Sequence, residues 1–270
     1  MSKEQSTLYE ELRELRERTK EKLKEFPLQF TEEQIRSRQE RGLPLLDISL
    51  LSFDRDLATA TLAKIHELMA AHNPKGIELS GLIEILKKKE FSLEEFIKNS
   101  ISLDAAYLSA LSKETGVDMS SLFFIGTNFA RPYLETLFPG LRDKVKTDNT
   151  WLKNICPFCG GKPLIAKLRR EDGKRVLQCA SCNTCWFYPR GKCPFCGNED
   201  GETLRFFFVD EKEPYRVDVC DKCKGYIKTV DEKKFPGDKE LDLFLENIYT
   251  PRLDSLAERE GYRGFGIQCP

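Results

Sequence analysis

The pentapeptide C-P-F-C-G occurs twice in this chain, at Cys156–Gly160 and at Cys193–Gly197. Each copy is followed by a second C-x-x-C pair, so the cysteines form two groups with the spacings C-x2-C-x19-C-x2-C and C-x2-C-x23-C-x2-C. Two residues between paired cysteines let a tight turn present both sulfurs to one ion, and two such turns complete a tetrahedron of thiolates. This pattern predicts two metal sites. Their ligands are Cys156, Cys159, Cys179 and Cys182, and then Cys193, Cys196, Cys220 and Cys223.

The residue after each cysteine pair supports the same interpretation. Gly160 and Gly197 follow the first pair of each group, and glycine adopts a left-handed conformation without steric cost. Asn183 holds the equivalent place after Cys182. After Cys223 that place is taken by Lys224, and a glycine, Gly225, comes one residue later. Each group has too few residues for a core of its own, so we expect each to fold around its metal.

Zinc and iron both accept four thiolates in a tetrahedron, and the spacing leaves the two metals open. Four cysteines also permit an iron–sulfur cluster, although paired turns on hairpins favour a single ion. A thioredoxin-like redox pair would need a surrounding βαβ pattern, which the sequence lacks. Because four protein ligands fill each site, neither is predicted to act directly in metal-assisted hydrolysis.

Two of the ten cysteines fall outside these groups. Cys185 lies three residues after Cys182; it is a candidate redox thiol or substitute ligand, and the favoured interpretation is a buried small side chain beside Trp186. Cys269 is the penultimate residue and has no predicted role.

Nine of the cysteines lie between Cys156 and Cys223, and the first 150 residues have none. This change predicts four segments: a helical domain at 1–150, the two tetracysteine units at 151–187 and 188–232, and a C-terminal helix with a tail at 233–270. Helical signals precede the boundary, including a capping box at Thr31–Gln34 and another at Ser92–Glu95. Hairpin signals surround Asp172-Gly173 and a turn that contains Pro214. The predicted fold class is therefore α+β, with an all-α N-terminal domain, two tandem rubredoxin-like or zinc-ribbon-like units and a C-terminal helix.

Charge and hydropathy exclude several classes of protein. The formal net charge is −1, and the apolar runs are too short to cross a bilayer, so no membrane insertion is expected. The N-terminus is charged throughout and lacks the apolar stretch of a signal peptide, so a cytoplasmic location is expected.

The charge of the cysteine region bears on nucleic-acid binding. From Trp151 to Lys228, 15 basic and 10 acidic side chains give +5, and two tetrathiolates with divalent ions reduce this to about +1. A nucleic-acid-binding ribbon is therefore the weakest hypothesis, although Arg169, Arg170, Lys174 and Arg175 cluster at one hairpin tip in the manner of a solvated turn.

The cysteine region resembles the FdhE family of formate dehydrogenase accessory proteins. The resemblance rests on CPFCGGKP, QCASCNTCWFYPRGKCPFCGNED and DVCDKCKGYIKTV, and on Ala130–Leu134, Trp151 and the tail that ends at Glu260–Arg263. It implies two rubredoxin-like units whose eight cysteines hold metal, with iron indicated by the family and zinc as the alternative. It also implies a cytoplasmic, non-enzymatic maturation factor, a kind of chaperone, whose partner is the molybdenum-containing catalytic subunit of formate dehydrogenase. In this chain Cys185 replaces an acidic residue of the family pattern, and Gly264–Pro270 departs from the usual tail.

An electron-transfer or redox factor is the alternative function, because iron held by four thiolates exchanges one electron. No Walker loop, G-x-G-x-x-G or G-x-S-x-G motif occurs, and the sequence predicts no enzyme and no catalytic residue. The sequence does not specify an oligomeric state.

Overall fold

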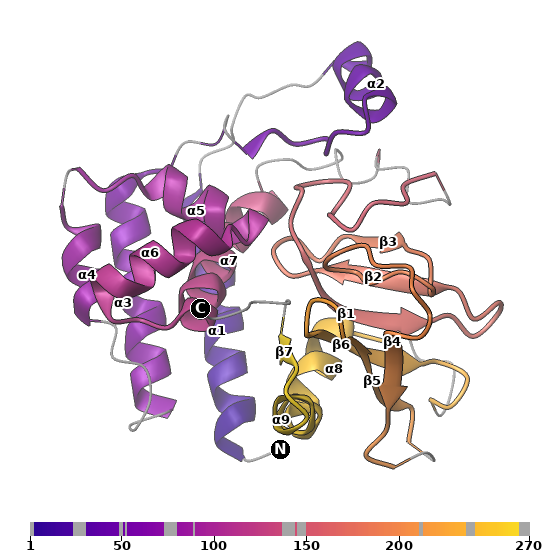
Figure 1. Cartoon of the computed structure of the whole chain (residues 1–270). Coiled ribbons are helices and arrows are strands. Elements are labelled where there is room, and N and C mark those ends of the chain that lie inside the picture. Colours follow the sequence, from indigo (N-terminus) through magenta and orange to yellow (C-terminus); the bar gives the residue numbers. More distant parts are fainter. Residues whose placement is uncertain are drawn as a thin grey trace. The chain divides into compact units, whose positions relative to one another are not determined.

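The computed structural model describes residues 3–23, 31–48, 51, 53–72, 80–88, 90–136, 144, 150–210, 213–235 and 241–264. The chain divides into two compact units (Figure 1). The first comprises Met1–Gln39 and Leu45–Asp143, and the second comprises Glu40–Pro44 and Lys144–Pro270. The finer division into four segments that the sequence predicts remains a proposal.

The regular secondary structure of the first unit is helical wherever the structure describes it. Its helices are α1 (Lys3–Lys22), α2 (Glu32–Glu40, which ends at the boundary), α3 (Arg55–His72), α4 (Ser80–Leu86), α5 (Leu93–Ser102), α6 (Ala105–Thr115) and α7 (Met119–Thr136). Both predicted capping boxes begin helices: the Gln34 amide N–H donates to Oγ1 of Thr31 over 3.2 Å, and the Glu95 amide donates to Oγ of Ser92 over 3.1 Å. The N-terminal all-α prediction is confirmed.

The core of this unit is built around α7. Phe129 and Tyr133 on this helix pack with Phe53, and the three ring centroids lie 4.8 to 5.6 Å apart. Gly126 lets α7 approach α5, because a Cβ there would come within 2.1 Å of the Ser100 hydroxyl oxygen. Pro132 lies inside α7 without ending it. None of the helices in the described ranges combines the length and the apolar character that a bilayer crossing requires.

The second unit contains a seven-stranded mixed sheet with the order β3-β2-β1-β6-β5-β4, and β7 pairs with β6 outside this path (Figure 1). Its strands are β1 (Pro163–Leu168), β2 (Arg175–Cys179), β3 (Cys185–Phe187), β4 (Leu204–Phe207), β5 (Tyr215–Cys220), β6 (Gly225–Asp231) and β7 (Arg263–Gly264). Two helices follow the main strands: α8 (Leu243–Tyr249) and α9 (Pro251–Arg259).

Each tetracysteine group contributes one antiparallel part of this sheet. Strand β1 then pairs in parallel with β6, with Ile165 opposite Lys228 and Leu168 opposite Asp231. The two parts therefore share one sheet, a pairing between distant segments that the sequence patterns did not predict. The sequence pattern of Lys239–Glu260 predicts a helix interrupted at Pro251. The structure confirms the interruption, since α8 ends at Tyr249 and α9 begins at this proline.

One face of the sheet is covered by the C-terminal helices. Val217 and Val219 of β5 pack with Leu253 and Ala257 of α9, and Tyr262 completes this cluster. Lys228 of β6 is buried on the same side and forms a 2.6 Å ion pair with Asp254 of α9. The α+β fold class predicted from the sequence is confirmed.

Candidate metal centres

The first candidate centre is formed by the cysteines at the ends of the β1–β2 hairpin. Cys156 and Cys159 precede β1, Cys179 is the last residue of β2, and Cys182 follows in the turn to β3. The Sγ–Sγ distances are 3.6 Å for Cys156–Cys182, 3.5 Å for Cys159–Cys179 and 3.4 Å for Cys159–Cys182. A tetrahedron with metal–sulfur bonds of about 2.3 Å has an edge of about 3.8 Å. The four sulfurs are therefore spaced closely enough to surround one ion.

The second candidate centre repeats this arrangement on the β4–β5 hairpin. Cys193 and Cys196 precede β4, Cys220 ends β5, and Cys223 follows in the turn to β6. The Sγ–Sγ distances are 3.6 Å for Cys193–Cys223 and 3.8 Å for Cys196–Cys220. In each group all four sulfurs lie within 4.8 Å of one another. All eight cysteines predicted as ligands are thus brought together in the two predicted sets of four.

All four C-x-x-C turns share one backbone conformation. The residue after the second cysteine has a positive φ in each: Gly160 at 75°, Asn183 at 58°, Gly197 at 72° and Lys224 at 54°. In the last turn the left-handed residue is Lys224 rather than Gly225, which begins β6. A lysine in this region is sterically unfavourable, so the turn itself must hold it there.

Backbone amides point at the sulfurs. The amides of Phe158, Ser181 and Phe195 each donate to a cysteine Sγ two residues earlier over 3.4 Å. Amide hydrogen bonds to sulfur favour the thiolate form, which is the form that binds metal.

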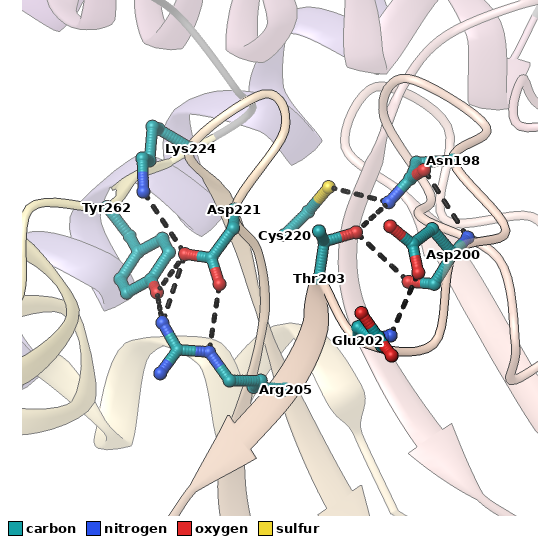
Figure 2. A network of polar contacts seen from close by, with 9 residues as sticks. All are labelled: Asn198, Asp200, Glu202, Thr203, Arg205, Cys220, Asp221, Lys224 and Tyr262. Carbon is teal, nitrogen blue, oxygen red and sulfur yellow. Dashed lines mark hydrogen bonds and ion pairs between the residues drawn. The ribbon is translucent and has the colours of Figure 1, made fainter.

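Side chains near the second centre form two adjacent polar groups, shown in Figure 2. Nδ2 of Asn198 lies 3.6 Å from Sγ of Cys220 and 2.7 Å from Oγ1 of Thr203. On the other side of Cys220, Asp221 accepts hydrogen bonds from Arg205 over 2.9 and 3.0 Å and from the Tyr262 hydroxyl over 2.7 Å. The second polar group thereby ties β4 and the turn after Cys220 to the segment that follows α9.

The thiols within each group differ in pKa. Burial raises the pKa of Cys156 and Cys159 well above the ordinary thiol value. At Cys182 the effect of burial is outweighed by hydrogen bonds from the other three thiols, which lower its pKa. In the second centre a hydrogen bond from Cys223 lowers the pKa of Cys193 to about 5, and the same bond raises the pKa of Cys223.

In each group, therefore, one cysteine has a lowered pKa while others have a raised pKa. A bound ion would displace the remaining protons and offset the charge of all four sulfurs. Because the donors are sulfur alone, the set fits a soft or borderline metal such as zinc or iron.

The two centres differ in exposure. All four cysteines of the first are buried, and none is more than 1% exposed. In the second, Cys193 and Cys220 are buried, whereas Cys223 is partly exposed and Cys196 is exposed. The same motif thus occupies two environments.

Cys185 lies outside both groups, in β3. It packs against the cluster of Ile165, Val230 and Leu243, and burial raises the pKa of its thiol. A thiol of raised pKa is a weak nucleophile, which favours the packing interpretation over a redox role. Cys269 lies outside the described residues.

Sequence reasoning missed three side chains near the centres. Arg175 was grouped with the solvated hairpin tip, but it is only 4% exposed and its Nη2 donates to the carbonyls of Pro189 and Lys192. That expectation was wrong for Arg175, because a residue at the start of β2 points either outward or inward according to the strand register. The amide of Asn154 donates to the carbonyl of Phe195 over 2.7 Å and links the two cysteine turns, and Asn198 contacts Cys220. Asparagines adjacent to the C-x-x-C pairs were the available signal.

Comparisons with known proteins agree on one family. Residues 155–190 match the family description "FdhE, central domain". A curated relative named Protein FdhE homolog, from Aquifex aeolicus, is 31% identical over 245 residues, covering 89% of this chain and 78% of the relative. Protein FdhE of Escherichia coli K12 is 26% identical over 234 residues, covering 84% and 69%. The crystal structure of the FdhE protein from Pseudomonas aeruginosa superposes with a TM-score of 0.56 at 20% identity, covering 96% of this chain and 87% of the other, and this likeness supports the fold.

Proposed function

The chain belongs to the FdhE family, and from this premise we propose that it is an accessory protein required for active formate dehydrogenase. In this proposal it acts in the cytoplasm, catalyses no reaction itself and binds the molybdenum-containing catalytic subunit. The observation that carries the proposal is the pair of four-sulfur groups within a chain related to FdhE proteins over most of its length. Four protein ligands leave no open position for a substrate, so each centre is suited to holding a rigid surface.

The proposed ligands are Cys156, Cys159, Cys179 and Cys182 for one ion, and Cys193, Cys196, Cys220 and Cys223 for the other. Iron is the metal that the family resemblance favours, and zinc fits the same donors. In either case the ion would join segments that short strands alone hold weakly: each group connects the start of one hairpin to its far end. The amides that point at the sulfurs would then fix the orientation of each turn.

A gene deletion in the native host tests this proposal. We expect the deletion to abolish formate-dependent dye reduction in cell extracts, and the wild-type gene on a plasmid to restore it. An immunoblot of the catalytic subunit distinguishes loss of the enzyme from loss of its activity. Normal formate dehydrogenase activity in the deletion strain would contradict the proposed role.

Binding to the catalytic subunit is tested separately. An affinity-tagged copy of the full chain should co-purify the formate dehydrogenase catalytic subunit from native-host extract. A variant with Cys156→Ser and Cys193→Ser should lose this partner, whereas Arg263→Gln, an exposed change in β7, should retain it. Equal recovery of the subunit with the double variant would show that the metal-bound surface is not what the partner contacts.

A redox role is the second candidate, and the exposure of the second centre favours it. Cys196 is exposed and Cys223 is partly exposed, so an iron ion there would lie near the surface and could exchange one electron with a partner. Visible spectra and metal analysis of protein purified from the native host test this idea. A colourless protein with two zinc ions would exclude it and leave the accessory role intact.

A further inference from the structure

A pocket of about 280 Å³ lies next to the second centre, on the sheet face opposite the C-terminal helices. The strand register fixes this placement. Val217 and Val219 of β5 pack against α9, so the alternate residues Arg216 and Asp218 point to the other face. Phe206 is paired with Asp218, and Thr229 is paired with both Arg216 and Ala166, so these residues share that face. We call this cavity the arginine pocket.

The lining of the arginine pocket is strongly basic. Its charged lining residues are Arg175, Arg190, Lys192, Arg205, Arg216 and, among the described residues, a single acid, Asp218. Arg205 is paired with Val219 and directs its guanidinium to Asp221 and Tyr262 on the helix side of the sheet, so the other four cations supply the positive charge of the pocket. They come from three strands and from the turn that leads into Cys193, so segments far apart in the sequence converge here. Convergence of arginines from separate elements distinguishes this site from a run of surface charges along one loop.

Three of these cations already have an acidic partner. Lys192 pairs with Glu199 over 2.5 Å, Arg205 pairs with Asp221 over 2.9 Å, and Arg216 pairs with Asp218 over 2.9 Å. Arg175 and Arg190 differ from them. Within the described part of the chain their hydrogen bonds go to backbone carbonyls, and neither has a carboxylate within ion-pair distance.

At Arg175 the lack of an ion-pair partner is energetically unfavourable. Its side chain is almost fully buried, burial lowers its pKa because the charge is desolvated, and its Nε has no hydrogen-bond partner among the described residues. Nε of Arg216 is likewise buried without a partner, while the guanidinium of Arg216 stacks on the ring of Phe206, 4.6 Å from its centroid. Asp218 pairs with Arg216 and attracts the charge of Arg175 only from beyond ion-pair distance, so one carboxylate serves two desolvated guanidinium groups. Such an excess of buried positive charge is unfavourable unless a further anion approaches it.

We propose that the arginine pocket binds a small dianion of the phosphate class. The planar fork of arginine matches phosphate oxygens, and several such forks around one cavity favour a multiply charged ligand over a monoanion. The volume is near the lower limit for ligand sites, which fits phosphate, pyrophosphate or a small phosphomonoester. Gly191 lies in the lining with no atom within 4 Å of its Cβ position, so the backbone of the turn is open to a ligand.

The second tetracysteine group is the competing partner for this charge. Cys193 and Cys220 also line the pocket, and four thiolates around a divalent ion carry a net negative charge. If the arginines served only to offset this charge, the pocket would have no affinity for added phosphate. A direct binding measurement therefore separates the two interpretations.

Isothermal titration calorimetry on the metal-loaded full chain provides that measurement. Inorganic phosphate, pyrophosphate, glycerol 3-phosphate and citrate are titrated separately at constant ionic strength in a phosphate-free buffer. We expect saturable 1:1 binding with a dissociation constant below about 1 mM for at least one phosphate compound, and weaker binding of citrate. Free phosphate and phosphate esters are distinguished by the first and third titrations. Absence of saturable binding by all three phosphate compounds, or tighter binding of citrate, would overturn the proposal.

Variants locate the site. Arg190→Gln and Arg216→Gln should each weaken phosphate binding about tenfold, because a hydrogen bond to a charged group is lost. Arg263→Gln removes the same charge from an exposed position outside the pocket lining and should bind like the wild type. Arg190 is exposed and its substitution should leave the fold intact, which circular dichroism and metal content verify. Wild-type affinity in both pocket variants would show that phosphate binds elsewhere, whatever the outcome of the formate dehydrogenase experiments.

Discussion

The two tetracysteine centres have the same ligands and the same turns, but they differ in their surroundings. The first is enclosed: its four cysteines are buried, and Phe158 in its C-P-F-C-G turn is fully buried. The second opens to solvent at Cys196 and Cys223, and its equivalent phenylalanine, Phe195, is only partly buried. The second centre also adjoins the arginine pocket.

This difference teaches that duplication of a motif does not duplicate its environment. An ion in the buried centre would be shielded from partners and chelators, and we expect it to hold the sheet together. An exposed centre on the same sheet can meet a partner or exchange its ion while the first keeps the fold. We therefore expect the first centre to govern stability and the second to govern function.

The largest expected effect is a difference in stability between two single variants, each of which removes one cysteine from one centre. Cys179→Ser, at the end of β2, should cost on the order of 5 kcal/mol or more in unfolding free energy, because a structural metal contributes about 10 kcal/mol or more. Cys196→Ser should lower metal content toward one ion per chain and leave most of the fold in place. Metal analysis and thermal melts followed by circular dichroism compare the two. Equal destabilisation by both variants would contradict the expectation that the first centre contributes more to stability than the second.

Chelator kinetics should show two phases in the wild type. A metal-sensing dye in excess is expected to remove the ion of the second centre first, because Cys196 and Cys223 are open to solvent. The first ion should follow only as the unit unfolds. The Cys196→Ser variant identifies the phases, since it should lack the fast one. A single phase that releases two ions together would show that exposure does not control exchange.

Polar contacts to the sulfurs should produce smaller, centre-specific changes. Asn198→Ala removes the amide near Cys220 and should weaken metal binding at the second centre by about 10- to 100-fold. Thr184→Val is the corresponding substitution at the first centre, because the Thr184 hydroxyl lies 3.2 Å from Sγ of Cys182. Competition titrations with a chelator of known affinity measure both. If the Asn198→Ala protein binds metal at the second centre with normal affinity, Asn198 does not contribute to that centre.

The smallest expected effects concern the glycines that follow the two C-P-F-C turns. Gly197→Ala should cost about 1 kcal/mol from the left-handed backbone alone, because no atom lies within 4 Å of the added Cβ. Gly160→Ala carries the same strain and also brings its Cβ within 3.2 Å of Cγ of Pro44, so it should cost more. Denaturant unfolding of the metal-loaded proteins measures the difference in unfolding free energy between the two variants. A larger loss for Gly197→Ala would reverse the predicted order.

The sequence by itself determined which cysteines come together in two sets of four, because a C-x-x-C turn is local and its geometry follows from four or five consecutive residues. Capping boxes at Thr31 and Ser92 and the helix start at Pro251 were predictable for the same reason. Only the tertiary structure decided which centre is exposed. The two C-P-F-C-G segments are identical, yet Cys159 is 1% exposed and Cys196 lies at the surface.

The parallel pairing of β1 with β6 and the burial of Arg175 were also decided at this level. Both depend on segments far apart in the chain, and neither leaves a local pattern. Burial is a property of the neighbours that a residue acquires on folding, so two identical peptides acquire different chemistry when different surfaces pack around them.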